Sequence, residues 1–184
     1  AQNISATKNG AFTGEISAEQ VKDFDIKWTL IGHSERRTLY GETNELVAAK
    51  TKLAQENGLC AILCVGETLE QREAEKTNDV LKEQLAAVKN SVSDWSKIVI
   101  AYEPVWAIGT GKTATPEIAQ ATHAYIRSWM TENLSAEIAT ATRIQYGGSA
   151  NAGNAAALIA QPDIDGFLVG GASLKPEFGA IVSA

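Results

Sequence analysis

The sequence has little of what marks proteins that bind nucleic acid, cross membranes or depend on disulfides. Lysine and arginine number 16 against 22 aspartate and glutamate, which gives a net charge of −6. This balance argues against nucleic acid or an anionic membrane as the partner, because neither attracts an acidic chain. No apolar run approaches the roughly 18 residues of a membrane-spanning helix, and the polar start does not resemble a signal peptide. We therefore expect a partner that is neither nucleic acid nor membrane.

Cysteine and histidine are also scarce, with two residues of each. Cys60 and Cys64 share one apolar run. A strand would place them about 13 Å apart at roughly 3.3 Å per residue, which is too far for a disulfide. Their spacing, with no histidine nearby, does not match a zinc site either. The sequence therefore predicts buried, reduced thiols, as in a cytoplasmic protein, and no metal site.

What the chain does have is the ordinary composition of a globular protein, with 45% hydrophobic and 21% charged residues over 184 positions. This length, without a linker, predicts a single domain over residues 1–184. Five short apolar runs each end in a polar or glycine-rich turn, which is typical of parallel strands buried on both faces. The runs are Trp28 to Gly32, Ala61 to Gly66, Lys97 to Glu103, Arg143 to Gly147 and Gly166 to Gly170.

Helical patterns lie between these runs. The alternation of strand and helix, repeated about five times, indicates an α/β protein with a parallel sheet and right-handed crossovers. The pattern leaves open whether the sheet is doubly wound or part of a (β/α) barrel. Predicted helices begin near Ser17, in a capping box with Gln20; near Glu42, with Leu46 and Leu53 on one stripe; and near Thr115, with Ile118, Thr122, Tyr125 and Trp129 at helical spacing. A further helix is predicted from the face shared by Leu81, Leu85, Val88 and Val92, and another from Asn151 to Ala160.

The polar residues that follow the strands are the candidate site, because ligands of parallel α/β folds meet the carboxyl ends of the strands. His33 and Glu103 are the two that suit general acid–base catalysis. Each could instead be structural, as a half-buried histidine or an ion-paired carboxylate, but their pairing at strand ends favours chemistry. His123 falls within a predicted helix and is expected to be a packing or surface residue.

Glycine-rich turns supply the other candidates. Gly109 to Thr113 is similar to a phosphate loop but lacks the upstream glycine, because Trp106 occupies that position. Small residues from Ala107 to Ala114 suit a flexible lid instead. The pairs Gly147-Gly148 and Gly170-Gly171 follow the last two strands, where barrel enzymes often build phosphate sites from backbone N–H groups.

Five longer motifs are more specific than these single residues. They are Gly10-Ala-Phe-Thr-Gly-Glu-Ile16, Ile31-Gly-His-Ser-Glu-Arg-Arg37, Ala101-Tyr-Glu-Pro-Val-Trp-Ala-Ile-Gly-Thr-Gly-Lys-Thr-Ala114, Tyr146-Gly-Gly-Ser149 and Gly166-Phe-Leu-Val-Gly-Gly-Ala-Ser-Leu-Lys175. In this order they resemble the triosephosphate isomerase family over the whole chain. The resemblance implies a (β/α)8 TIM barrel, of which the chain would hold about five to six units. It also implies an isomerase of glycolysis and gluconeogenesis that interconverts dihydroxyacetone phosphate and glyceraldehyde 3-phosphate through an enediolate, without metal or cofactor.

The resemblance also implies a role for individual residues. Glu103 would be the base that removes a proton beside the substrate carbonyl, and His33 the neutral electrophile that polarises that carbonyl. Ser34 and Glu35 would support them, and Thr13 would lie near the tip of a loop that reaches the neighbouring subunit of a homodimer. The phosphate would be bound by Gly109, Ser149, Gly170 and Gly171. The lid would comprise Pro104, Val105, Trp106, Ala107, Ile108, Gly109, Thr110, Gly111, Lys112, Thr113 and Ala114.

The beginning of the chain differs from the family pattern, because it resembles the end of the family's third strand. We expect the two preceding units, with an Asn-x-Lys motif, to lie outside it, and an isolated chain of 184 residues to isomerise slowly. Three explanations stay open: a piece of a longer enzyme, a chain complemented by a separate piece or subunit, or a short impaired protein. The competing functions are phosphate binding without turnover, and a different phosphosugar enzyme such as an aldolase. An aldolase would need a Schiff-base lysine at a strand end, where none of the five runs ends in lysine.

Overall fold

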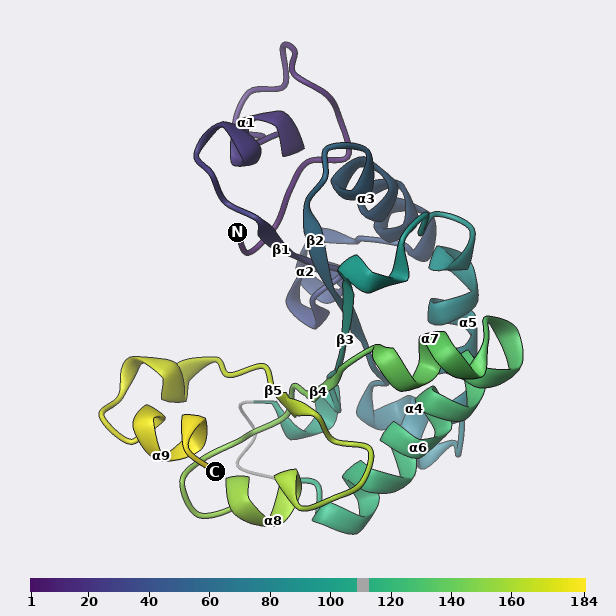
Figure 1. Cartoon of the computed structure of the whole chain (residues 1–184), viewed down its shortest axis with the longest axis vertical. Coiled ribbons are helices and arrows are strands. Elements are labelled where there is room, and N and C mark those ends of the chain that lie inside the picture. The colour runs from purple at the N-terminus through teal and green to yellow at the C-terminus, as the bar shows by residue number, and fades with distance from the viewer. Residues whose placement is uncertain (109–112) are drawn as a thin grey trace. The chain divides into compact units, whose positions relative to one another are not determined.

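The computed structural model describes residues 1–108 and 113–184 (Figure 1). Helices alternate with strands along these residues. The strands are β1 (Trp28–Ile31), β2 (Cys60–Val65), β3 (Ile98–Tyr102), β4 (Ile144–Tyr146) and β5 (Gly166–Phe167). The helices are α1 (Ala18–Asp23), α2 (Ser34–Tyr40), α3 (Asn44–Glu56), α4 (Leu69–Glu73), α5 (Thr77–Lys89), α6 (Pro116–Asn133), α7 (Ala136–Ala141), α8 (Ala155–Ile159) and α9 (Phe178–Val182). The segments Trp95–Lys97, Val105–Ala107 and Gly171–Leu174 form 3₁₀ turns.

The chain divides into two compact units, one of residues 1–65 and 82–99, the other of residues 66–81 and 100–184. In the first unit β1 and β2 pair in parallel, with Trp28 opposite Cys60 and Ile31 opposite Leu63. Helix α3 packs on both strands. The core of this unit includes fully buried residues of α3, β2 and α5: Val47, Ala54, Ala61, Leu63, Leu85 and Val88.

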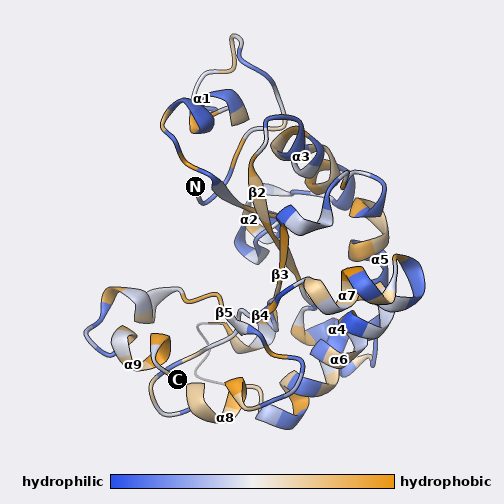
Figure 2. Cartoon of the chain, viewed as in Figure 1, coloured by the Kyte–Doolittle hydropathy of each residue, from blue (hydrophilic) through white to orange (hydrophobic). Residues whose placement is uncertain are grey.

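In the second unit the part of β3 from Ile100 onward, β4 and β5 also pair in parallel. Tyr102 lies opposite Tyr146, which in turn lies opposite Phe167. Strand β3 is buried along its whole length, and Figure 2 shows it as hydrophobic. Helix α6 packs against α7 and α8. The parallel α/β class expected from the sequence is therefore confirmed, with strands at all five apolar runs.

The helices confirm most of the expected starts and change some of the expected faces. Thr43 caps α3 by accepting the N–H of Leu46, so the helix begins at Asn44 rather than at Glu42. Its buried face follows Val47 and Ala54, and Leu46 is only half-buried. On α6 the buried residues are Ala119, Thr122, His123, Ile126, Trp129 and Met130, and the expected Ile118 and Tyr125 lie at the half-buried edge.

Three further expectations need correction. Strand β5 ends at Phe167 rather than near Gly170, because its partner β4 ends at Tyr146 and accepts its last ladder bond from Leu168. The polar stretch after His33, expected to be a turn, forms helix α2. Cys64 is buried as expected but Cys60 is half-buried, and both are free thiols.

Candidate active site

His33 follows β1 in the first unit and begins α2 as its N-cap. Its imidazole Nδ1 accepts a hydrogen bond from the backbone N–H of Glu35 at 3.3 Å. Gly32 before it has φ +75°, in the left-handed region that favours glycine. The His33 side chain is 24% exposed. The local chain therefore holds the ring at the end of the strand by a cap that satisfies an otherwise unpaired helical N–H group.

Two contacts of the same ring nitrogen bear on where the imidazole carries its proton. The Glu35 carboxylate Oε2 lies 3.9 Å from Nδ1, which is too far for a hydrogen bond. The Glu35 N–H instead donates to Nδ1, and a nitrogen that accepts cannot itself carry a proton. A neutral His33 therefore holds its proton on Nε2. Such a ring offers an N–H donor, the group that can polarise a carbonyl.

The neighbours of His33 have different environments. Ser34 is buried, whereas the Glu35 side chain is 69% exposed in the first turn of α2. An acidic residue in the first turn is favourable to the helix itself, because it faces the positive end of the helix dipole. The supporting role expected for Glu35 stays a prediction.

Glu103 follows β3 in the second unit and is 2% exposed. Two glycines enclose it. A Cβ atom on Gly66 would lie 1.7 Å from the Glu103 carbonyl oxygen, and one on Gly147 would lie 3.0 Å from Glu103 Cγ. A side chain on Gly66 would collide with the Glu103 backbone, and one on Gly147 would crowd the Glu103 side chain, so this packing restricts where the carboxyl group leaves the backbone.

These contacts correct one expectation about the glycine pairs. The N–H of Gly147 donates to the Tyr102 carbonyl at 2.7 Å, so it is not available to an anion. A Cβ on Gly148 would lie 2.2 Å from the Tyr146 hydroxyl oxygen. Packing within the chain therefore accounts for glycine at position 148 and favours it at position 147, without any ligand.

The lid residues nearest Glu103 form the 3₁₀ turn Val105–Ala107, with Pro104 buried before it. Glu67, fully buried at the end of β2, anchors this turn. Its carboxylate accepts hydrogen bonds from Trp106 Nε1 at 2.9 Å, Tyr102 Oη at 3.1 Å and Arg72 Nη1 at 3.2 Å. Its backbone carbonyl accepts the Val105 N–H at 3.1 Å. Thr113 is exposed and Ala114 buried, and the predicted lid residues Gly109, Thr110, Gly111 and Lys112 lie outside the described residues.

The Glu67 cluster has marked electrostatic consequences. The Arg72 guanidinium pairs with Glu67 and stacks over the Trp106 ring at 4.6 Å from its centroid. Burial, with the nearby Glu67 carboxylate as a further cause, raises the pKa of the Tyr102 phenol well above its ordinary value. The phenol therefore stays protonated and remains a donor to Glu67. The sequence does not predict this arrangement, since Tyr102 and Trp106 lie 35 and 39 residues from Glu67.

The predicted phosphate ligands that the structure describes have unequal surroundings. Ser149 is half-buried, and its hydroxyl donates to the Ala107 carbonyl at 2.6 Å, which joins it to the lid turn. Gly170 and Gly171 are exposed, and a Cβ on either would meet no atom of the described chain within 4 Å. Contacts within the described chain therefore leave space beside the backbone at both positions. Gly109, the fourth ligand predicted, is among the residues the structure leaves undescribed.

His123 is a packing residue, one of the two roles expected for it. It is fully buried, its Nδ1 lies 3.0 Å from the Asp163 carbonyl oxygen, and its ring meets Tyr102 edge-on at 5.7 Å. Burial lowers its pKa from 6.5 to about 4, so the ring is neutral at physiological pH.

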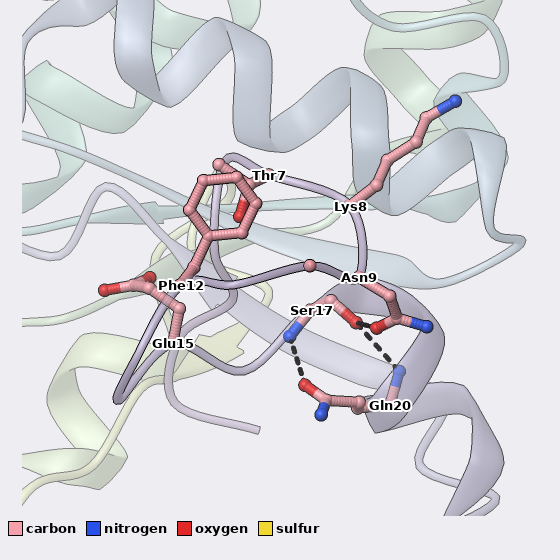
Figure 3. Close-up of a pocket in the computed structure, with 8 residues that line it drawn as sticks. Thr7, Lys8, Asn9, Phe12, Glu15, Ser17 and Gln20 are labelled. Atoms are coloured by element: carbon pink, nitrogen blue, oxygen red, sulfur yellow. Dashed lines mark hydrogen bonds between the residues drawn. The ribbon is translucent and has the colours of Figure 1, made fainter.

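The loop expected to reach a neighbouring subunit lies in the first unit, with Thr13 exposed near its tip. Ser17 ties its base together, because its hydroxyl donates to Asn9 and its N–H donates to Gln20 at 2.8 Å (Figure 3). A cavity of about 150 Å³ lies inside the loop. Phe12 and Ile16 are 48% and 59% exposed, which leaves apolar surface on this loop.

Residues 1–108 and 113–184 offer neither a membrane-spanning helix nor a cluster of metal ligands. Within them no helix is long and apolar enough to cross a membrane. Nor do the same residues contain three or more histidine, cysteine, aspartate or glutamate side chains grouped to hold a metal ion.

Fold and site together define a class: a parallel α/β protein of the (β/α)-barrel type, with an imidazole and a carboxylate following its strands. Comparison with known proteins narrows the class. The family model of triosephosphate isomerase matches residues 1–184. Triosephosphate isomerase of Paracoccidioides lutzii is 59% identical over 186 residues, covering all of this chain and 75% of that protein. The cytosolic enzyme of Oryza sativa subsp. japonica is 55% identical, covering all of this chain and 73% of that protein. For the chloroplastic enzyme of Fragaria ananassa the identity is 57%, over all of this chain and 59% of that protein.

The chain therefore belongs to the triosephosphate isomerase family, and it is an enzyme of the isomerase class. The expectation of a triose-phosphate isomerase, drawn from the sequence, is confirmed. The structure brings Ser34 and Glu35 beside His33 in the first unit, and the lid turn and Ser149 together in the second unit, which also holds Glu103. The roles of these residues stay predictions.

Proposed function

We propose that the chain interconverts dihydroxyacetone phosphate and glyceraldehyde 3-phosphate by proton transfer through an enediolate. The match of the family model to every residue from 1 to 184 carries this proposal. The reaction only moves protons between two adjacent carbons and their oxygens. It therefore needs a base, a proton donor and exclusion of water, and no cofactor.

Glu103 serves as the base. Its carboxylate removes the proton from the carbon beside the substrate carbonyl and returns it to the neighbouring carbon, so the carboxylate is regenerated in each turnover. Close packing against Gly66 and Gly147 supports this role, because it fixes the backbone from which the carboxylate extends. A base that is held in place does not have to be ordered again in each transition state.

His33 serves as the electrophile. Its Nε2–H donates to the substrate carbonyl oxygen and stabilises the negative charge that the enediolate places there. The cap bond from the Glu35 N–H to Nδ1 supports this role, because it holds the proton on Nε2. Glu35 and Ser34 support the ring from the same turn of α2.

The phosphate of the substrate is bound by Gly109, Ser149, Gly170 and Gly171, and Pro104 to Ala114 close over it. The bond from the Ser149 hydroxyl to the Ala107 carbonyl supports a link between phosphate site and lid. The open space around Gly170 and Gly171 supports close approach of an anion to their backbone. Closure would exclude water from the enediolate.

A homodimer in the cytosol is the proposed setting, with the Thr13 loop reaching the partner and the reaction serving glycolysis and gluconeogenesis. The exposed Phe12 and Ile16 support the interface, since contact would bury them. Sedimentation of the chain with Thr13→Glu and Phe12→Ser together should give half the mass of the parent. A parent chain that sediments as a monomer would contradict the dimer.

A coupled assay with glyceraldehyde 3-phosphate tests the activity. We expect Glu103→Gln and His33→Gln each to lower kcat by about 10² to 10⁴-fold, the usual contribution of a positioned acid or base. Glu132→Gln, an exposed carboxylate on α6, is the matched control and should leave kcat unchanged. Binding of inorganic phosphate without turnover would instead support the phosphate-binding alternative. If Glu103→Gln turns over as fast as the parent, Glu103 is not the base.

A further inference from the structure

Arg37 contacts both peptide groups that flank His33. Its guanidinium Nε donates to the carbonyl of Gly32 at 2.9 Å. Its own backbone N–H donates to the carbonyl of His33 at 3.2 Å. One residue, a single helical turn away, is therefore bonded to the carbonyl before His33 and to the carbonyl of His33 itself.

The other end of the guanidinium is anchored on α3. Arg37 Nη1 donates to Asn44 Oδ1 at 2.7 Å, and Asn44 is the first residue of α3. The Asn44 side chain is itself held, because its Nδ2 donates to Glu83 Oε1 on α5 at 3.3 Å. Arg37 thus links the end of β1 to a helix that packs on the same strand.

The carbonyl that Arg37 binds belongs to Gly32, a residue whose backbone conformation is not restricted by a side chain. Gly32 has φ +75° and could adopt many other conformations, since it lacks a Cβ. A Cβ there would meet Val47 at 3.0 Å and Arg37 Nη2 at 3.2 Å, so Arg37 and Val47 already occupy that space. If the Gly32 peptide rotated, His33 would leave the extended cap geometry of φ −51°, ψ 142° that turns its ring back onto α2.

We propose that Arg37 is a positioning residue: through the Gly32 carbonyl it holds His33 so that Nδ1 stays on the Glu35 N–H and the proton stays on Nε2. The inference rests on the proposed function in that the electrophile is His33, but the positioning of the ring is a property of the chain itself. Arginine suits the role because its planar fork donates to two acceptors at once, whereas lysine offers one point charge.

The test is the tautomer of the ring, observed by NMR of the chain labelled with ¹⁵N-histidine. The chain has two histidines, and the buried His123 serves as internal reference for the fold. Spectra are recorded at about pH 8, above the ordinary histidine pKa of about 6.5. In the parent chain we expect widely separated ring signals for His33, with Nδ1 unprotonated. In Arg37→Met we expect the separation to narrow as the tautomer with its proton on Nδ1 gains population.

Arg36→Met is the matched control. It also removes a guanidinium from α2, but the Arg36 guanidinium binds Glu42 and not the Gly32 carbonyl. It should leave the tautomer of His33 as in the parent. Arg37→Lys tests the same point should Arg37→Met not fold, and it should give a mixture between the parent and Arg37→Met. The proposal is overturned if a folded Arg37→Met gives the same His33 signals as the parent. If Arg37→Met does not fold, the same result in Arg37→Lys overturns it.

Turnover gives a second readout that separates positioning from binding. We expect kcat of Arg37→Met to fall about tenfold or more with KM changed by less than about threefold, since the ring would be misplaced but the phosphate ligands intact. A parent chain without turnover would count against the proposed function and leave the tautomer measurement to decide the role of Arg37. If the His33 tautomer is the same in Arg37→Met as in the parent, the positioning role of Arg37 is rejected even when the chain is active.

Discussion

A Cβ atom on Gly66 would lie 1.7 Å from the carbonyl oxygen of Glu103, a separation that no relaxation of side chains could relieve. Gly66 and Glu103 are 37 residues apart in the sequence, yet their backbones lie in close contact. Gly66→Ala therefore has to move backbone, and we expect it to lower the free energy of unfolding by at least about 4 kcal/mol. Urea denaturation followed by circular dichroism measures the change.

The matched control for this substitution is Gly179→Ala in α9, where a Cβ would meet no described atom within 4 Å. It should change the stability by less than about 1 kcal/mol, in the stabilising direction, because alanine favours a helix. Equal effects of the two substitutions would show that the close approach at Gly66 does not constrain the chain.

Glu67→Gln should loosen the turn that follows Glu103. The glutamine would keep the size of the side chain but lose the charge that pairs with Arg72, and its amide would face N–H and O–H donors. We expect a loss of stability of about 2 to 4 kcal/mol, as when a buried ion pair loses one partner. The indole of Trp106 loses its best acceptor, so its fluorescence should also shift.

The comparison for Glu67→Gln is Glu70→Gln, an exposed carboxylate on α4. It removes the same charge three residues away and should cost no more than about 0.5 kcal/mol. A Trp106 emission that is unchanged in Glu67→Gln would argue that the carboxylate does not hold the turn.

The strands were predictable because their signal is local. A short, nearly continuous apolar run marks a parallel strand wherever it occurs, and four of the five were located to within two residues at each end. The exception, β5, ends early because β4 ends at Tyr146, and the length of a partner strand cannot be seen in the run itself.

Helix α2 and the Glu67 cluster show what the sequence could not supply. A histidine is not among the residues that commonly cap helices, so the polar stretch after His33 gave no helix signal. Glu67 and Trp106 are 39 residues apart, and no spacing rule connects them. The glycine pair Gly147-Gly148 predicts close approach of a ligand, and its sequence cannot show that Glu103 and Tyr146 pack against these two residues.

His123 should make the protein less stable in mild acid. Its pKa is lowered from 6.5 to about 4, chiefly by burial. Between pH 6.5 and about pH 4 the unfolded chain therefore binds a proton at His123 that the folded chain does not bind. Stability therefore falls as pH drops from about 6.5 towards 4, by up to roughly 3 kcal/mol from this one group. Urea denaturation at a series of pH values measures the slope.

Two variants isolate that contribution. In His123→Gln the group is gone, so the loss of stability over this window should be smaller than in the parent by roughly 3 kcal/mol. In Ile126→Val, which changes a buried residue of the same helix but removes no titratable group, the slope should stay close to that of the parent. A slope that His123→Gln leaves intact would assign the acid sensitivity to other groups.

Gln55 on α3 should contribute strongly to the stability of the first unit. Its buried amide makes four hydrogen bonds: Oε1 accepts from Ser93 N–H at 3.1 Å, Ser93 hydroxyl at 2.9 Å and Asp94 N–H at 2.9 Å, and Nε2 donates to the Asp94 carbonyl at 3.0 Å. Gln55→Ala would leave several of these groups without partners, at a cost of about 3 kcal/mol in the free energy of unfolding. Lys52→Ala, on an exposed position of the same helix, should stay within about 0.5 kcal/mol. Amide hydrogen exchange tests how far the effect of Gln55 extends. Ser93 and Asp94 directly precede the 3₁₀ turn that leads into β3, so exchange at the N–H groups of Ile98 and Val99 should be faster in Gln55→Ala. An unchanged exchange rate at these two residues would limit the role of Gln55 to the turn alone.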